Sequence, residues 1–122
     1  MLFRSADISL EVAQKSKDAI AKRLTKSVEK GKMAQADMDK IVSNLKPVAS
    51  LAEFKEVDIA IEAATEQVGL KIELFKKLDE AVKPEAILAS NTSSISITLM
   101  AASTKRPTRV VGMHFKIGRA HV

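Results

Sequence analysis

The sequence alternates short apolar segments with longer amphipathic ones, and this alternation constrains the fold more than any other feature. Residues 57–63 (VDIAIEA) and 86–89 (AILA) have the length and apolar content of buried strands, and residues 109–115 (RVVGMHF) predict a third strand. Between the first two, residues 67–82 predict a helix. Strands that alternate with helices favour right-handed βαβ units and a parallel sheet, so the expected fold class is α/β. The apolar face expected for that helix consists of Leu70, Leu74, Phe75, Leu78 and Val82.

Three further helices are expected. Residues 9–30 predict a long amphipathic helix that Gly31 ends, and residues 34 to about 45 predict a shorter one that a proline follows. A polar turn, SNTSS at residues 90–94, leads into a short helix that runs to Met100. The side chains expected to face inward are Val12, Ile20, Leu24 and Val28 in the long helix and Met38, Ile41 and Val42 in the shorter one.

Composition narrows the classes of function. A chain of 122 residues suits one domain, and no apolar run reaches the roughly 18 residues of a membrane span. With Cys 0 there is no disulfide framework, which suits a reducing cytoplasm, where we expect the protein to act. The net charge of +5 suits either nucleic acid or a polyanionic small molecule such as a phosphorylated cofactor, and charge alone does not choose between them. Because the lysines are interspersed with acidic residues and Tyr and Trp are absent, we expect no nucleic-acid partner.

The residues at both ends of the sequence resemble translated adaptor DNA. Residues 2–5 (LFRS) and 117–122 (IGRAHV) correspond to translations of a common sequencing adaptor in its two orientations. We therefore expect residues 1–5 and 117–122 to be foreign and residues 6–116 to be part of a larger domain. On this view Arg4, Arg119 and His121 carry no functional weight, and the natural protein continues on both sides.

Polar residues follow each expected strand, at the edge where parallel sheets bind ligands. Glu62 and Glu66 flank the end of the segment at 57–63, so at least one carboxylate is expected at this edge; the alternative is that both are solvated residues of a helix start. The SNTSS turn offers donors to a ligand, or serves only as a helix cap. His114 lies near the end of the third strand and is either a general base or a structural histidine.

Asp7 stands just before the long helix. In a dinucleotide-binding fold an acidic residue there accepts hydrogen bonds from the adenosine ribose hydroxyls. The alternative is a helix-capping or loop aspartate. The G-x-G-x-x-G motif that cradles phosphates is absent from the sequence, and without Cys or paired His no metal site is expected.

Read together, these segments resemble the 3-hydroxyacyl-CoA dehydrogenase family, and within it the bacterial 3-hydroxybutyryl-CoA dehydrogenases. The resemblance runs in order from residue 7 to residue 115, and ASNTSS followed by GMHF is its most specific part. It implies a partial Rossmann-like, doubly wound parallel sheet that lacks its first strand and glycine-rich loop. The segments that carry it are VEKGK (28–32), VDIAIEAATE (57–66), LKIELFKKLD (70–79), PEAILASNTSSISIT (84–98) and KRPTRVVGMHF (105–115).

The resemblance also implies roles for individual residues. His114 is the expected general acid/base, moving the proton of the 3-hydroxyl while a hydride passes between C3 and the nicotinamide of NAD. Ser93 is expected to hydrogen-bond the substrate oxygen beside the nicotinamide. Asp7, Glu66 and Lys71 are the expected NAD contacts, and Lys30 is the expected contact of the coenzyme A phosphates.

The expected parent is a homodimeric enzyme that interconverts short-chain (S)-3-hydroxyacyl-CoA and 3-oxoacyl-CoA in fatty-acid oxidation or butyrate metabolism. In the family, F-N-P and an orienting glutamate follow the histidine; here Lys116 and Ile117 follow Phe115, so this chain alone is expected to be nearly inactive. One alternative is the dehydrogenase segment of a bifunctional enoyl-CoA hydratase/dehydrogenase. The other is a non-catalytic protein that reuses the fold.

Overall fold

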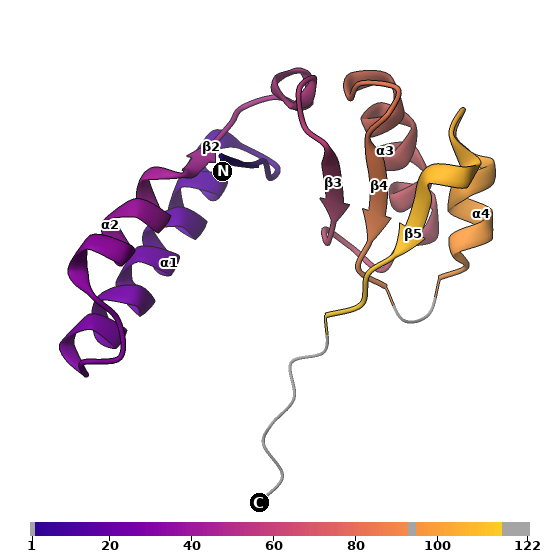
Figure 1. The fold of residues 1–122 in the computed structure, drawn as a ribbon. Coiled ribbons are helices and arrows are strands. Elements are labelled where there is room, and N and C mark those ends of the chain that lie inside the picture. Colours follow the sequence, from indigo (N-terminus) through magenta and orange to yellow (C-terminus); the bar gives the residue numbers. More distant parts are fainter. Residues whose placement is uncertain (1, 93–94, 116–122) are drawn as a thin grey trace, which may run out of the picture. The chain divides into compact units, whose positions relative to one another are not determined.

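The computed structural model describes residues 2–92 and 95–115, which divide into two compact units, Met1–Glu53 and Phe54–Val122. Each unit contains a parallel sheet with helices (Figure 1). The α/β class predicted from the alternation of segments is therefore confirmed. Among the described residues, no helix combines the length and the apolar character that crossing a membrane requires.

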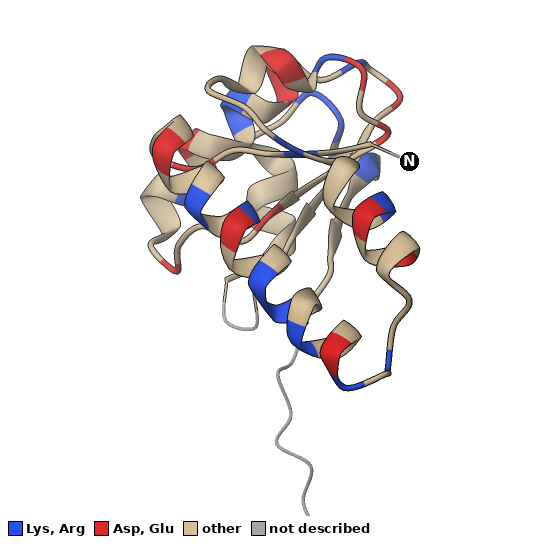
Figure 2. Ribbon diagram, turned by 90° about the vertical axis from the view of Figure 1, so that its left-hand side faces the viewer, with Lys and Arg blue, Asp and Glu red and all other residues tan. Residues whose placement is uncertain are grey.

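The first unit is a two-stranded parallel sheet whose strands are connected by two helices. Basic and acidic residues are interspersed along its helices (Figure 2). Lys15 and Glu11, for example, form an exposed ion pair in which Nζ and Oε1 lie 3.1 Å apart. The positive charge is therefore not gathered into one block. The elements are β1 (Phe3–Ser5), α1 (Leu10–Glu29), α2 (Gln35–Ser43) and β2 (Leu45–Pro47), and a short 3-10 helix, Leu51–Phe54, follows.

Helix α1 begins and ends with well-defined caps. The Ser9 hydroxyl accepts a hydrogen bond from the amide of Val12, which satisfies a free donor of the first turn. At the other end Gly31 adopts a left-handed φ of 69°, and its amide and that of Lys32 donate to the carbonyls of Val28 and Ser27. This pair of bonds is the Schellman arrangement, which favours glycine at this position. The prediction that Gly31 ends the helix is confirmed.

Strands β1 and β2 were not predicted. Phe3 pairs with Leu45 and Ser5 with Pro47, so three of the residues that the sequence analysis set aside form part of a sheet. Helix α2 accordingly ends at Ser43, before the residue 45 that was expected, and Leu45 enters the strand. Strands of three residues are too short to carry an alternating pattern, which explains why the sequence did not reveal them. The foreign origin of residues 1–5 and 117–122 stays a prediction.

The second unit is a three-stranded parallel sheet in the order β3-β4-β5, whose arrows point the same way in Figure 1. Ile59 pairs with Ile87, and Leu88 pairs with Val110. The strand, helix, strand sequence that was predicted is confirmed, with ends shifted by a few residues. The elements are β3 (Ile59–Glu62), α3 (Val68–Ala81), β4 (Ile87–Ser90), α4 (Ile97–Ala102), a 3-10 helix (Pro107–Arg109) and β5 (Val110–Gly112).

Most of the core of the second unit lies on one face of this sheet. Alternate residues of the strands face α3 and α4, where Phe75 and Met100 are completely buried. The prediction of buried strands is confirmed for most of residues 86–89, since Ala86, Leu88 and Ala89 are 0% exposed. It is wrong for alternate residues of β3, because α3 and α4 lie on one face of the sheet. Apolar sheet residues that are buried are Ala60, Leu88, Ala89 and Val110, whereas Ile59, Ile61, Ile87 and Val111 remain between 37% and 48% exposed.

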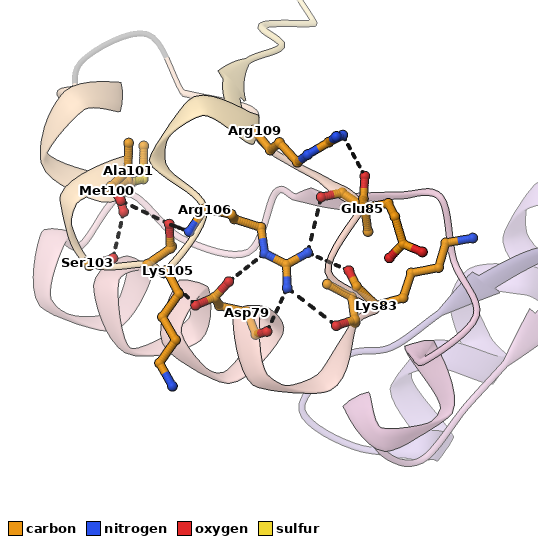
Figure 3. A network of polar contacts seen from close by, with 12 residues as sticks. Asp79, Lys83, Glu85, Met100, Ala101, Ser103, Lys105, Arg106 and Arg109 are labelled. Atoms are coloured by element: carbon orange, nitrogen blue, oxygen red, sulfur yellow. Dashed lines mark hydrogen bonds and ion pairs between the residues drawn. The ribbon is translucent and has the colours of Figure 1, made fainter.

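An arginine joins the elements at the amino ends of the strands. The Arg106 guanidinium binds the Asp79 carboxylate and donates to the carbonyl of Lys83 at 2.6 Å, as Figure 3 shows. It also donates to the carbonyl of Ala86 at 3.1 Å. The carbonyl of Asp79 accepts a further bond of 2.9 Å from the same group. These bonds satisfy carbonyls at the end of α3 and hold the segment that leads into β4.

Candidate active site

The carboxyl ends of the three parallel strands define the candidate site. Strands β3, β4 and β5 end at Glu62, Ser90 and Gly112, and the residues that follow include Glu66, the start of the SNTSS turn and His114. Parallel strands bring all three ends to one edge of the sheet, where ligands bind in open α/β folds. The structure therefore gathers at one edge the segments that the sequence placed there separately.

Beneath this edge lies a buried cluster formed by Glu62, Lys71 and Ser90, called the Glu62 cluster below. The Lys71 ammonium is 2.7 Å from Glu62 Oε2, and the Ser90 hydroxyl donates to the same oxygen at 2.8 Å. The other carboxylate oxygen, Oε1, accepts a 2.6 Å bond from the amide of Ala64. The side chains of Glu62 and Lys71 are 0% and 1% exposed. The alternative of two solvated glutamates is therefore wrong for Glu62.

The contacts of the Glu62 carboxyl favour its ionised form in spite of its burial. Burial by itself raises the pKa of the Glu62 carboxyl, but hydrogen bonds from Lys71, the Ala64 amide and Ser90 together hold this pKa below its ordinary value. Each partner stabilises the ionised carboxylate. The cluster thus links α3 to the ends of β3 and β4 through an ion pair that is shielded from solvent.

This lowered pKa predicts how the cluster contributes to acid stability. A carboxyl whose pKa is lower in the folded state than in the unfolded state stabilises the fold at any pH above its unfolded-state pKa, which is near 4.5. This stabilisation is lost as the pH falls through the folded-state pKa. We expect Glu62→Gln to lower the free energy of unfolding at pH 7 and to flatten its decline below about pH 4.5. Urea unfolding between pH 3 and pH 7 measures both effects. Glu73→Gln, an exposed change on α3, is the matched control, and an equal slope in both variants would contradict the assignment.

Above the cluster, side chains connect the loops that follow the strands. The Thr92 hydroxyl donates to Glu66 Oε2 at 3.1 Å, and Asn91 Oδ1 accepts the backbone amide of Phe115 at 2.8 Å. The amide of Met113 donates to the carbonyl of Ser90 at 2.9 Å. The loops after β3, β4 and β5 are therefore bonded to one another. Within the part of the chain that the structure describes, no group of acidic and histidine side chains could hold a metal ion.

Three of the predicted site residues belong to this unit and are described. His114 lies two residues beyond β5 and is exposed, and Glu66 is an exposed carboxylate at the same edge. Lys71, in contrast, is 0% exposed and lies below the edge, against Glu62. Ser93, the residue expected to meet the substrate oxygen, lies outside the described residues, as do residues 116–122.

The other two predicted residues belong to the first unit. Asp7 follows β1 by two residues and is exposed; its Oδ1 accepts the amide of Ile8 at 2.7 Å. Because Ser9 caps α1, the helix-cap alternative for Asp7 is wrong. Lys30 is exposed at the other end of α1. At a rise of 1.5 Å per residue, the 20 residues of this helix separate Lys30 from Asp7 by about 30 Å. Asp7 and Lys30 therefore cannot act on the same chemical group.

The sequence analysis missed the pairing of Glu62 with Lys71, although two signals for it exist. Glu62 occupies the same face of β3 as the buried Ala60, as the two-residue period of a strand requires. Lys71 precedes Phe75 and Leu78 at helical spacing, so it belongs to the buried stripe of α3. Leu70, which was expected in that stripe, is 55% exposed.

The fold and the ligand-binding edge together define a Rossmann-like dehydrogenase domain. Solved dehydrogenases share this arrangement: (S)-3-hydroxybutyryl-CoA dehydrogenase from Ralstonia eutropha superposes with a TM-score of 0.91 at 40% identity, over 95% of this chain and 41% of that protein. The 3-hydroxybutyryl-CoA dehydrogenase of Escherichia coli K12 gives a TM-score of 0.89 at 39% identity, over 92% of this chain and 24% of that one.

The family follows from the sequence match. The family model for the NAD binding domain of 3-hydroxyacyl-CoA dehydrogenase matches residues 3–117, and the chain belongs to this family. It is 48% identical over 94 residues to 3-hydroxybutyryl-CoA dehydrogenase from Clostridioides difficile, covering 77% of this chain and 34% of the relative. It is 42% identical over 109 residues to the fatty acid oxidation complex subunit alpha of Pseudomonas aeruginosa. This match covers 89% of this chain and 15% of that relative. The chain thus spans less than half the length of these relatives.

Proposed function

We propose that the protein containing this chain is an NAD-dependent dehydrogenase that interconverts a short-chain (S)-3-hydroxyacyl-CoA and the corresponding 3-oxoacyl-CoA. The observation that carries the proposal is the edge of the second unit, where the segment around His114 is bonded to the start of the SNTSS turn. A base on one loop and hydroxyl donors on the next can both reach one substrate oxygen. Family membership supplies the reaction type.

The residues present fit NAD at two places. Asp7 and Glu66 are exposed carboxylates that follow the ends of parallel strands, where hydroxyl groups of a dinucleotide find acceptors. The sequence contains no G-x-G-x-x-G, so these residues do not provide a phosphate loop. The fully buried Lys71 supports the cofactor indirectly in this proposal, by holding the carboxylate of Glu62 and the strand ends.

In the proposed reaction, the cofactor supplies a hydride acceptor for C3 of the substrate. His114 removes the proton from the 3-hydroxyl in this direction and returns it to the oxygen in the reverse direction, since imidazole exchanges protons readily near neutral pH. Ser93, the residue after Thr92, is proposed to donate a hydrogen bond to the same oxygen. Lys30 is proposed to bind the phosphates of coenzyme A. The resemblance also leads us to infer a homodimeric whole protein.

A second candidate is the dehydrogenase segment of a longer multifunctional protein. The observation that favours it is the 42% identity to the alpha subunit of the Pseudomonas aeruginosa fatty acid oxidation complex. The chemistry proposed for His114 is the same in both cases. Sequencing the DNA that flanks this reading frame distinguishes them, because an upstream hydratase domain would identify the longer protein.

A chimeric enzyme tests the proposed reaction. Residues 6–115 replace the matching segment of the probable 3-hydroxybutyryl-CoA dehydrogenase from Bacillus subtilis, to which this chain is 41% identical over 112 residues. The junction lies before Lys116, so the relative supplies every residue after Phe115. We expect the chimera to oxidise NADH when acetoacetyl-CoA is added, measured as loss of NADH absorbance. The unmodified relative is the positive control. A folded chimera that binds NADH and turns over no substrate would support the non-catalytic alternative instead.

A further inference from the structure

The backbone around His114 is held from both sides by residues at the end of β4. Ahead of His114, the Met113 amide donates to the carbonyl of Ser90 at 2.9 Å. After it, the Phe115 amide donates to Asn91 Oδ1 at 2.8 Å. Two hydrogen bonds on successive sides of one residue limit its backbone rotation, and so they limit where its Cα–Cβ bond points.

The bond from the Phe115 amide differs from the one before it because its acceptor is a side-chain oxygen and not a backbone carbonyl. The last paired residues of β4 and β5 are Ser90 and Gly112, and the bond from Met113 continues this ladder by one step. Beyond that point the chain after β4 turns into the SNTSS loop, and the amide oxygen of Asn91 accepts the next backbone N–H of the neighbouring segment. The ladder is thus extended past the residue proposed as the base.

Asn91 is itself fixed in place. Its backbone amide donates to the carbonyl of Glu62 at 2.8 Å, and the preceding Ser90 belongs to the Glu62 cluster. The end of β5 is also packed from the helix side, since a Cβ at Gly112 would lie only 3.2 Å from Cγ1 of Ile97. The backbone of Asn91 is therefore fixed beside a strand end that has little freedom to move, and its side-chain oxygen reaches the Phe115 amide from this fixed point.

From this geometry we propose that Asn91 is a positioning residue for His114: its side-chain oxygen holds the Phe115 amide and thereby sets the direction of the imidazole for proton transfer. The proposal rests on the proposed function for its catalytic part. Asn91 acts through the backbone and does not need to touch the substrate. Losing the acceptor should therefore reduce kcat and leave the binding of NADH nearly unchanged.

The first test uses the 122-residue chain and concerns only the backbone. Amide hydrogen exchange, followed by NMR, reports whether the Phe115 N–H is hydrogen-bonded. We expect Asn91→Ala to accelerate exchange at Phe115, and Asn91→Asp, which keeps an oxygen at the same position, to leave it slow. Asn44→Ala is the matched control, because Asn44 is the only other asparagine and belongs to the first unit. Unchanged exchange in Asn91→Ala would overturn the proposal.

The second test uses the chimeric enzyme. We expect Asn91→Ala to lower kcat roughly 10- to 100-fold with little change in the Kd for NADH, and Asn91→Asp to recover most of the loss. The added carboxylate of Asn91→Asp should also shift the pH profile of kcat upward, because a nearby negative charge favours the protonated imidazole. Faster exchange at Phe115 together with an unchanged kcat would overturn the positioning role.

The two tests separate this inference from the proposed function. An unmodified chimera without activity would contradict the proposed reaction and the catalytic part of the inference, whatever the exchange data show. An active chimera in which Asn91→Ala weakens NADH binding as much as kcat would contradict the inference alone. In that case Asn91 would contact the cofactor itself.

Discussion

Lys71→Met is expected to lower the free energy of unfolding of the chain by about 3–5 kcal/mol, the cost of leaving one partner of a buried ion pair alone. Methionine keeps most of the length of the lysine side chain and removes its charge. The Glu62 carboxylate, 0% exposed, would then keep its bonds from Ser90 and the Ala64 amide but would have no countercharge. Urea or thermal unfolding followed by circular dichroism measures the loss.

Two further variants show whether the loss comes from the unpaired charge. Lys77→Met is the matched control on the exposed side of α3 and should change stability by less than about 0.5 kcal/mol. Adding Glu62→Gln to Lys71→Met removes the buried charge that the single change leaves, so the double variant should be more stable than Lys71→Met alone. A double variant that sums the two single losses would show that the ion pair is not the cause.

His114→Gln in the chimeric enzyme is expected to lower kcat by roughly 10²-fold or more, which is the scale of a lost general base. Glutamine keeps a polar group near the same position and cannot take up a proton at neutral pH. The exposed position of His114, two residues past β5, makes a loss of folding an improbable cause of the effect. Steady-state kinetics with NADH and acetoacetyl-CoA measure the change.

The interpretation of this variant depends on its controls. The Kd for NADH should remain close to that of the unmodified chimera, since His114 is proposed to act on the substrate proton. Thr108→Gln, an exposed change just before β5, should leave kcat unchanged. Unreduced turnover in His114→Gln would remove His114 from the proposed mechanism, and another group would have to carry the proton.

Within residues 2–92 and 95–115, local patterns in the sequence were sufficient to predict most of the helices and three of the five strands. Helix α1 is an example: its apolar spacing and the glycine at position 31 predict both its extent and its end, and these signals come from residues close together in the chain. The two strands that were missed, β1 and β2, are stable only as a pair of segments about forty residues apart. No local pattern reports such a pairing.

The features of the candidate site likewise divide into those that the sequence revealed and those that only the tertiary structure revealed. The sequence by itself determined the family resemblance and the candidates His114, Glu66 and the SNTSS turn, because residue type and order along the chain carry that information. Only the tertiary structure decided that Lys71 is buried against Glu62 and that Asn91 holds the backbone beyond His114. These contacts join residues that are 9 and 24 positions apart. The first arises because α3 packs on the sheet beside β3, and the second because the parallel pairing of β4 and β5 brings distant segments to one edge.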